Sequence, residues 1–303
     1  MYNVSVIMST YNGERFIEEQ IESIFLQKNC KVNLFVRDDN SSDNTLNILN
    51  KLKNKYPIEI IADQKNLGPA QSFLTALKKC PFDTEFYAYA DQDDVWYSDK
   101  LEKACLKLSE VSNEKVSLYC STYDVVDENL DVIFTRDLNQ YGKITMEKTL
   151  MGISPSGCTM VFNRNLKEKL DLSNPDYMRM HDFWTLLTLQ AYSGNLIIDN
   201  EATMAYRQHG NNTVGFSNKF ELKHWKRLFL SIKNDNERLR QAQSVWNNYK
   251  EVLNENNRVS ILNLLNYKNN LRNKFNLIRN SRYNSNVSRI NLLFKLSILM
   301  GIF

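Results

Sequence analysis

Short runs of β-branched and aromatic residues alternate with amphipathic stretches along the first 90 residues, and this alternation limits the fold more than any other feature. The apolar runs are typical of buried strands, and the apolar residues between them recur at helical spacing. The expected strands cover 4–8, 32–36, 58–61 and 85–90, and the expected helices cover about 14–27, 43–54 and 69–79. Such alternation predicts an α/β domain of βαβ units with a mostly parallel central sheet.

Polar clusters follow three of the expected strands, at residues 9–14, 37–43 and 91–94. In open parallel sheets, ligands bind outside the carboxyl ends of the strands. Because all three clusters come at such ends, we expect them to meet along one edge of the sheet and to form a single site. The sequence contains neither a GxGxxG nor a GxxxxGK[ST] motif, so neither a Rossmann dinucleotide site nor a P-loop is indicated.

Length and composition narrow the class of protein. With 303 residues, 43% of them hydrophobic and 24% charged, the chain suits one or two globular units rather than a disordered segment. Its five cysteines form no CxxC pair, which argues against a disulfide framework or a cysteine zinc site and fits a reducing cytosol. The first residues lack a signal-peptide pattern, and no long apolar stretch predicts an ordinary transmembrane helix. We therefore expect a cytoplasmic protein.

Charge divides the chain near residue 216. Residues 217–303 contain 16 Lys and Arg against five Asp and Glu, a net charge of +11, whereas residues 1–216 have a net charge of −8. We therefore expect one domain over 1–216 and a distinct basic region over 217–303. An acidic domain is a poor binder of nucleic acid, so no nucleic-acid partner is expected. The basic region suits an anionic lipid surface, an acidic polymer or another protein.

The acidic run Asp91-Gln92-Asp93-Asp94 follows the fourth expected strand. Carboxylates repel a diphosphate directly, but they bind one well through a divalent cation that oxygen ligands hold and that keeps positions open for phosphate. Asp91 and Asp93 would share a face of an extended chain, so one could bind the cation and the other a ribose hydroxyl. The alternative is a solvated turn or a helix N-terminus, where aspartate is also favoured.

The other two clusters supply further polar groups and an aromatic ring. Asp38 and Asp39 follow the second strand and could accept hydrogen bonds from a nucleotide base, while the next serine or aspartate caps the following helix. The candidates after the first strand, in which the tyrosine could stack on a pyrimidine, are Thr10, Tyr11, Asn12 and Glu14. The alternative for this segment is a turn that needs Asn12-Gly13 for its backbone angles.

Four spans of the sequence resemble family 2 glycosyltransferases of the GT-A fold: VSVIMSTYNGERFIEEQIESI, LFVRDDNSSDNTLNIL, KNLGPAQSF and YAYADQDDVWYSDKLEKA. The aspartate pair after the second strand, the Asp-x-Asp motif and a later His-Asp pair occur in the order of that family. ADQDDVW followed by DKL, with HDFW and YRQHGNN further along, is similar to the bacterial rhamnosyltransferase branch. The resemblance covers roughly residues 2–216. It implies an inverting glycosyltransferase that uses Mg²⁺ or Mn²⁺.

The resemblance also implies roles for individual residues. Asp93 and Asp91, with His209 as a third ligand, would hold the metal on the donor diphosphate. Asp182 would be the catalytic base, although an aspartate at a helix start is usually a cap. The residues implied at the nucleotide are Thr10, Tyr11, Asn12, Glu14, Asp39 and Asp91. The other candidates for donor or acceptor contacts are Asp94, Trp96, His181 and Arg207.

Several of these candidates have structural alternatives. His181 would flank or orient the base and Arg207 would pair with phosphate oxygens, but Trp96 could equally be a buried anchor for the next helix. A lone loop histidine is the commoner case for His209. The segment 154–159 could line the donor-sugar pocket or form a turn, and the sequence Gly-Asn-Asn at 210–212 suits a mobile loop that closes over the donor.

The resemblance favours dTDP-L-rhamnose as the donor and a hydroxyl of a growing cell-surface polysaccharide or lipid-linked glycan as the acceptor, with a UDP-hexose as the other donor candidate. A nucleotide-sugar pyrophosphorylase also uses an α/β nucleotide domain and Mg²⁺. It would be expected to carry a Gly-rich phosphate loop near the N-terminus, where this chain has only Asn12-Gly13-Glu14. A non-catalytic binding protein is the third class, and the presence of both Asp93 and Asp182 argues against it.

After about residue 219 the strand signals end. Apolar residues at helical spacing over 222–232 and near 262–271 predict several helices, rich in asparagine and therefore of poor intrinsic propensity, that pack on the first domain or on a second subunit. Residues 290–303 are apolar with one lysine and are too short to span a bilayer of about 30 Å. They predict either an interfacial helix at the inner face of the cell membrane or a helix in a core or a homo-oligomer.

Overall fold

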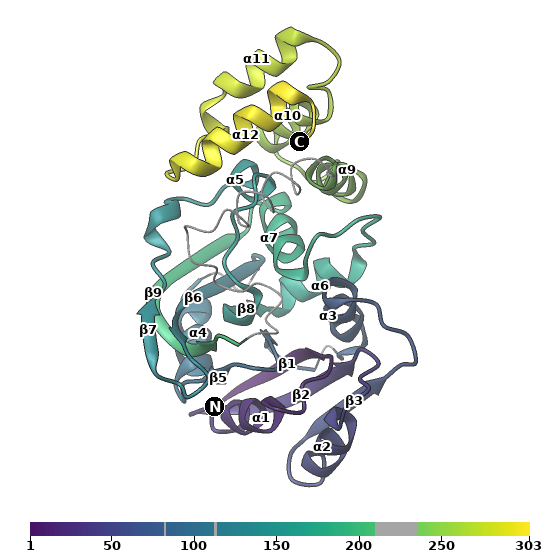
Figure 1. The fold of residues 1–303 in the computed structure, drawn as a ribbon, viewed down its shortest axis with the longest axis vertical. Coiled ribbons are helices and arrows are strands. Elements are labelled where there is room, and N and C mark those ends of the chain that lie inside the picture. The colour runs from purple at the N-terminus through teal and green to yellow at the C-terminus, as the bar shows by residue number, and fades with distance from the viewer. Residues whose placement is uncertain (82, 112–113, 210–235) are drawn as a thin grey trace.

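The computed structural model describes residues 1–303 except 82, 112–113 and 210–235. In that part of the chain, one sheet carries helices on both faces, and further helices stack beyond one end of it (Figure 1). Hydrogen bonds join the strands in the order β3-β2-β1-β4-β8-β6-β9-β5, with β7 paired to β6. Their bounds are Tyr2–Thr10 (β1), Cys30–Asp38 (β2), Ile58–Ala62 (β3), Phe86–Ala90 (β4), Val95–Trp96 (β5), Ser117–Val126 (β6), Val132–Thr135 (β7), Met160–Asn163 (β8) and Asn195–Arg207 (β9).

Strands β1 to β4 form the parallel half of the sheet, as the sequence predicts. β1 pairs in parallel with β2 on one side and with β4 on the other, and β3 pairs with β2. In this register Thr10 of β1 lies beside Asp38 of β2, and Met8 lies beside Ala90 of β4. The residues that follow these three strands therefore meet at one edge of the sheet, where ligands bind in folds of this kind.

The other half of the sheet is mixed. β8 runs antiparallel to both β4 and β6, whereas β6 pairs in parallel with β9. β5 and β7 pair antiparallel with β9 and β6. The predicted α/β class with a largely parallel central sheet is confirmed, and β8 is the antiparallel strand that joins two parallel groups.

Helices cover both faces of the sheet because successive side chains of a strand point to opposite faces. Val6 and Met8 of β1 belong to one hydrophobic cluster, and Ile7 between them belongs to the other. The first cluster includes residues of α1 (Ile17–Phe25), α2 (Thr45–Leu52) and α4 (Lys100–Ser109). The second includes residues of α3 (Pro69–Lys79), α5 (Met146–Leu150), α6 (Arg164–Leu172) and α7 (His181–Ala191).

Helices after residue 236 extend the second cluster beyond the sheet (Figure 1). They are α9 (Glu237–Tyr249), α10 (Glu255–Leu265), α11 (Leu271–Arg279) and α12 (Ser288–Met300). Tyr249, Ile261 and Phe294 from this region are buried in the same cluster as Trp184 of α7. The helix predicted over 222–232 lies outside the described residues, and so does the loop predicted at 210–212. No helix in the described ranges has both the length and the apolar character needed to cross a bilayer.

The asparagines of this region explain how helices form despite a poor propensity. The side chain of Asn254 accepts a hydrogen bond from the N–H of Asn257 (2.9 Å) at the start of α10. Asn270 accepts one from the N–H of Asn273 (2.8 Å) at the start of α11. Such caps satisfy backbone donors that a helix leaves free at its first turn. The same residue type that weakens a helix interior thus marks where these two helices begin.

Candidate active site

The polar segment after β1 is a turn fixed to the segment after β2. Asn12 has a φ of 49°, in the left-handed region that asparagine tolerates. Its N–H donates to the Oγ of Ser41 (2.9 Å), and its Oδ1 accepts from the N–H of Ser42 (2.8 Å). The N–H of Glu14 donates to the carboxylate of Asp43 (3.0 Å). The turn expected as the alternative for this segment is therefore present, and it brings the first two polar clusters together.

Gln92 joins the third cluster to the first. Its side-chain amide accepts from the N–H of Tyr11 (2.9 Å) and donates to the carbonyl of Tyr11 (3.1 Å). Gly13 permits this approach, because a Cβ at that position would lie 2.4 Å from Oε1 of Gln92. Sequence reasoning passed over Gln92, although its place between two aspartates was a signal. The ring of Tyr11 is half-exposed.

These segments enclose a cavity of about 450 Å³. The residues that line it are Tyr11, Asn12, Gly13, Arg15, Phe16, Gln92, Asp93 and His209. The cavity therefore lies at the carboxyl ends of β1 and β4, the edge at which the sequence predicts a ligand site.

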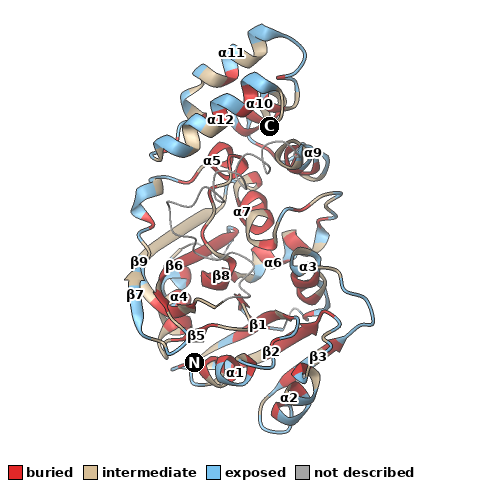
Figure 2. Ribbon diagram, in the orientation of Figure 1, coloured by how far each residue is buried: buried red, intermediate tan, exposed pale blue. Residues whose placement is uncertain are grey.

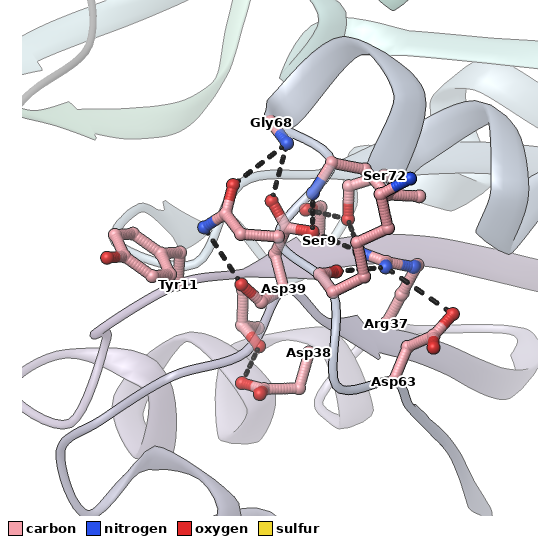
Figure 3. Close-up of polar contacts among 12 residues, drawn as sticks. Ser9, Tyr11, Arg37, Asp38, Asp39, Asp63, Gly68 and Ser72 are labelled. Atoms are coloured by element: carbon pink, nitrogen blue, oxygen red, sulfur yellow. Dashed lines mark hydrogen bonds and ion pairs between the residues drawn. The ribbon is translucent and has the colours of Figure 1, made fainter.

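Asp39 lies buried beneath this edge in the network that Figure 3 shows. Its Oδ1 accepts from the N–H of Leu67 (2.8 Å) and pairs with the guanidinium of Arg37, and its Oδ2 accepts from the N–H of Gly68 (2.8 Å). A carboxylate offers about four acceptor positions. Among these contacts, only one falls on Oδ2, so that oxygen retains an acceptor position toward a ligand.

Arg37 is the cation of this network, and sequence reasoning did not single it out. Its guanidinium is fully buried and donates to the Oγ of Ser72 (2.9 Å) and to the carbonyl of Lys65 (2.9 Å). The Oγ of Ser9 donates to Ser72 as well (2.7 Å). The sequence signal for Arg37 was its position at the end of an apolar strand. A charge buried there needs a partner of opposite sign nearby, which pointed to one of the adjacent aspartates.

The acidic run after β4 contains carboxyl groups that have few donors around them. The side-chain ligand atoms of Asp91, Asp94 and Cys158 all lie within 4.8 Å of one another. Burial and the charge of Asp93 raise the pKa of Asp91 to about 7, and burial raises the pKa of Asp94 well above its usual range. One oxygen of Asp94 accepts from the N–H of Arg207 (3.4 Å), and the other has no hydrogen-bond partner among the described residues.

This arrangement fits a divalent cation. Converging carboxylates, one with an unpartnered buried oxygen, are the ligands that Mg²⁺ and Mn²⁺ prefer. The Cys158 thiol is a poor ligand here, because burial raises its pKa well above the usual range and keeps it protonated. Of the predicted metal residues, Asp93 and His209 are in contact, with 2.8 Å between Oδ2 and Nε2. Asp91 belongs to the neighbouring group with Asp94.

Lys100 is a second buried cation that sequence reasoning missed. It is the first residue of α4, its Nζ lies 3.4 Å from the Oγ of Thr203, and it lies 4.9 Å from the ring centre of Trp96. Burial lowers the pKa of Lys100 to about 8, although the charge of Asp94 opposes this shift. The sequence signal for Lys100 was its position at the start of a helix. The helix dipole disfavours a lysine there, so its presence indicates a nearby negative charge. Lys100 thus balances part of the negative charge of the acidic run.

Trp96 and Arg207 make contacts within the protein. Trp96 is 3% exposed and packs in the hydrophobic cluster of α1 and α4, the position expected of an anchor for the next helix. The buried guanidinium of Arg207 donates to the carbonyls of Asp93 (3.1 Å) and Glu128 (2.7 Å). A pairing of Arg207 with phosphate would require an exchange of these contacts. In this arrangement Arg207 holds the backbone of the acidic run in place.

Asp182 and His181 are the first residues of α7. The Oδ1 of Asp182 accepts from the N–H of Phe183 (2.7 Å). Burial raises the pKa of Asp182 to about 6, although the N–H groups of Phe183 and Gly157 and the charge of Arg179 oppose the shift. The charge of Asp182 in turn raises the pKa of Asp91. The half-buried Asp182 therefore lies close enough to the acidic run to interact with it.

His181 lies under this part of the site. Its ring stacks on Phe73 (3.8 Å between centroids) and meets Tyr89 edge-on (4.7 Å). Neither ring nitrogen has a hydrogen-bond partner in the described part of the chain, and burial lowers the pKa of His181 to about 3. A Cβ on Gly157 would lie 2.3 Å from Nε2 of His181, so this glycine allows the two segments to touch. His181 thus flanks Asp182 by packing, as a neutral ring.

Comparisons with known proteins agree on a family. The family model described as "Glycosyl transferase family 2" matches residues 5–169. The chain is 32% identical over 235 residues to a dTDP-rhamnosyl transferase, RfbG of Shigella flexneri, which covers 74% of this chain and 78% of that protein. It is 31% identical over 165 residues to an Escherichia coli protein, WfgD, named as a UDP-Glc:alpha-D-GlcNAc-diphosphoundecaprenol beta-1,3-glucosyltransferase. That match covers 54% of this chain and 62% of WfgD.

Solved structures with the same fold include two proteins bound to nucleotide sugars. S. aureus TarS 1–349 in complex with UDP-GlcNAc matches with a TM-score of 0.59 and 18% identity over 99% of this chain and 82% of that one. The mannosyltransferase PcManGT from Pyrobaculum calidifontis, in complex with GDP-Man and Mn²⁺, matches with a TM-score of 0.54 and 17% identity. That alignment covers 99% of this chain and 80% of the other. At such identities the likeness concerns the fold.

Proposed function

The chain belongs to glycosyl transferase family 2, and on this basis we propose that it transfers L-rhamnose from dTDP-L-rhamnose to a hydroxyl of a growing cell-surface polysaccharide or lipid-linked glycan. Membership makes the protein a glycosyltransferase. The proposal adds the donor, the acceptor and an inverting, metal-dependent course. The 32% identity to a dTDP-rhamnosyl transferase supports the donor. A pyrophosphorylase and a non-catalytic binding protein, the other classes considered, do not agree with membership in this family.

The observation that supports this proposal most is a pair of carboxyl groups with different surroundings at one site. Asp182 has a pKa of about 6, so most of it is ionised at neutral pH and is able to accept a proton. Carboxylate oxygens of Asp91 and Asp94 converge beside Asp93, and one oxygen of Asp94 lacks a partner among the described residues, a donor set that fits a cation. Two carboxyl environments that differ in this way suit one base and one metal site.

The nucleotide would bind in the cavity at the ends of β1 and β4. Tyr11 presents a half-exposed ring there for stacking on a pyrimidine. The acceptor position left on Oδ2 of Asp39 suits the single ring N–H of thymine or uracil. Asn12 and Glu14 hold the turn that carries Tyr11, and Thr10 donates to Asp38 (3.1 Å) at the base of that turn.

Asp91 with Asp94, and the neighbouring pair of Asp93 and His209, would hold Mg²⁺ or Mn²⁺ beside the donor diphosphate. Such a cation, when bound, neutralises negative charge on the leaving diphosphate. Arg207 fixes the backbone of Asp93 through its carbonyl, and Lys100 offsets part of the negative charge beneath the site. These two residues therefore position the acidic run without touching the substrate.

In the proposed reaction, Asp182 accepts the proton of the acceptor hydroxyl. The hydroxyl oxygen forms a bond to the anomeric carbon on the face opposite the diphosphate. The bond between that carbon and the diphosphate oxygen breaks, and its electron pair leaves with the nucleoside diphosphate. One displacement of this kind inverts the anomeric configuration. The hydrogen bond from the N–H of Phe183 holds the carboxylate of Asp182 in place.

A panel of donors tests this proposal. Release of nucleoside diphosphate would be measured with dTDP-L-rhamnose, UDP-glucose, UDP-GlcNAc and GDP-mannose, each with and without EDTA. We expect turnover with dTDP-L-rhamnose that EDTA removes and Mn²⁺ or Mg²⁺ restores. A UDP-hexose is the second donor candidate, because the one acceptor position on Asp39 does not distinguish thymine from uracil. Full activity in EDTA would rule out the metal, and activity with GDP-mannose alone would rule out both donor candidates.

The proposal also covers the organisation of the chain. Residues 1–216 would form the catalytic domain, and the basic residues 217–303 would attach the enzyme peripherally to the inner face of the cell membrane, where a lipid-linked acceptor is available. The net charge of +11 over these residues supports attraction to anionic lipid. A homo-oligomer through the same residues is the alternative.

A further inference from the structure

Helix α12 has apolar side chains on two opposite faces. The inward face is buried: Phe294 stacks on Tyr283 and meets Phe303 edge-on, each at 5.1 Å between ring centroids, and Ile298 is fully covered. The outward face contains Leu292, Leu296, Leu299 and Met300, which are 42–58% exposed. Their spacing of four, three and one residues puts them on one side of the helix. The inward face accounts for the packing of α12, and the outward face has no covering element among the described residues.

Helices α11 and α12 lie at one end of the molecule. In Figure 1, α11 and α12 form the tip farthest from the strands β1 to β3, and Figure 2 shows that much of both helices is exposed. Leu271 and Phe275 of α11 are also exposed. The Nζ of Lys274 donates to the carbonyl of Leu299 (3.1 Å), so α11 lies against the C-terminal end of α12. The exposed apolar side chains of both helices are thus concentrated at one end of the protein.

Charge indicates what could cover this end. Residues 256–303 contain eight Lys and Arg and no Asp or Glu. Arg272 and Lys295 are exposed beside the apolar residues. A second copy of the chain would bring a second all-basic surface into contact, which like-charge repulsion disfavours. An apolar face surrounded by basic residues suits an anionic lipid surface, where the helix lies in the headgroup region and the cations contact the phosphates.

We propose that the outward face of α12 docks on an anionic bilayer, with Leu292, Leu296, Leu299 and Met300 in the interface and α11 beside it. The inference deepens the proposed function, because it rests on a lipid-linked acceptor for its purpose, but the docking itself rests on the structure of α12. Docking by a tip opposite the parallel strands leaves the nucleotide cavity open to the solution that supplies the donor.

Vesicle binding by the full chain tests the proposal. The variant carries Leu292→Gln, Leu296→Gln and Leu299→Gln, which keep a helix-forming residue at each place. The matched control carries the same change at Leu26, Leu106 and Leu172, leucines elsewhere on the surface that are 48–74% exposed and therefore at least as accessible. Co-sedimentation would be measured with vesicles of phosphatidylglycerol and phosphatidylcholine and with phosphatidylcholine alone. Thermal unfolding would verify that both variants fold as the wild type does.

We expect the wild type and the control to bind the anionic vesicles, and the α12 variant to bind them at least about tenfold more weakly. Added salt or the pair Arg272→Gln and Lys295→Gln should weaken binding too, whereas Lys31→Gln and Lys53→Gln should not. Equal binding by the α12 variant and the control would overturn the proposal. So would a wild-type dimer in solution that the α12 variant dissociates, because the face would then be an interface between copies.

The result for vesicle binding can be distinguished from the result for sugar transfer. Transfer to a water-soluble acceptor should be equal in the wild type and the α12 variant, since α12 lies beyond the end of the sheet, away from β1 (Figure 1). Vesicle binding without any sugar transfer would remove the proposed function and leave the docking face. Sugar transfer without vesicle binding would rule out the docking face and leave the proposed function.

Discussion

The aspartates after β2 and the aspartates after β4 lie at the same edge of one sheet, but they differ in how far protein donors and cations compensate their charge. Asp39 accepts two backbone N–H bonds and pairs with the buried Arg37. Asp91 and Asp94 are surrounded by other acids and have raised pKa values, and one oxygen of Asp94 lacks a partner among the described residues. The charge of Asp39 is compensated by Arg37, although one acceptor position remains on its Oδ2. The charge of the acidic run after β4 is compensated only in part by Lys100, and buried negative charge with few donors calls for a proton or a cation.

Asp182 belongs with the second group, since its pKa is also raised by burial. The comparison therefore separates an aspartate that protein contacts neutralise from aspartates that we propose take part in the chemistry. Changes in the first group should lower stability, and changes in the second should lower activity or ligand binding while the fold persists. Four experiments test this distinction.

Replacing the proposed base should produce the largest loss. We expect Asp182→Asn to lower kcat by about 10²–10⁴-fold, because an amide does not accept the acceptor proton. Asp176→Asn, at an exposed aspartate shortly before α7, is the matched control and should keep full activity. Steady-state kinetics on folded protein would measure both. An Asp182→Asn enzyme with wild-type kcat would remove Asp182 from the mechanism.

Replacing Asp39, whose carboxylate pairs with Arg37, should instead lower the free energy of unfolding. Asp39→Asn leaves the fully buried Arg37 without its main ion pair, and loss of one partner of a buried pair costs about 3–5 kcal/mol. Asp91→Asn removes a carboxyl group that burial already disfavours, so its stability should match or exceed that of the wild type. Urea unfolding at neutral pH gives both free energies. Equal losses in the two variants would contradict the comparison.

A divalent cation should stabilise the protein through the second group alone. With free Mn²⁺ at about 100 times its Kd, binding adds about 2.7 kcal/mol to the free energy of unfolding. The Tm should rise with Mn²⁺ in the wild type and in Asp176→Asn, and this rise should disappear in Asp93→Asn. A rise that survives in Asp93→Asn would mean that the cation binds elsewhere.

Acid should reduce activity through Asp182. Because its pKa lies at about 6 and its ionised form accepts the proton, kcat/KM should fall as the pH drops below about 6, by about tenfold per pH unit. The residual activity of Asp182→Asn should lack this limb. The profile would be measured with stability monitored at each pH. If the Asp182→Asn enzyme keeps the same fall of kcat/KM at acidic pH, a group other than Asp182 titrates.

Much of this molecule follows from local sequence patterns. The alternation of apolar runs and helical spacing predicts β1 to β4 and their helices, and α3 falls on the predicted range 69–79. The antiparallel direction of β8 does not follow from such patterns, because the direction of a strand depends on where the chain returns to the sheet. For the same reason the sequence did not reveal that Gly157 lies against both His181 and Asp182.

In the candidate site, too, some features follow from local sequence and others only from tertiary packing. Local sequence shows which residue types follow each strand, and it therefore predicts that carboxylates, a tyrosine and a turn meet at one edge, because periodicity and turn chemistry are properties of neighbours along the chain. Tertiary packing is what pairs Asp39 with Arg37 and leaves Asp91 without such an ion pair among the described residues, and it gives α12 one face in the core and one exposed. Burial and hydrogen-bond partners come from segments far apart in sequence, and no local pattern encodes them.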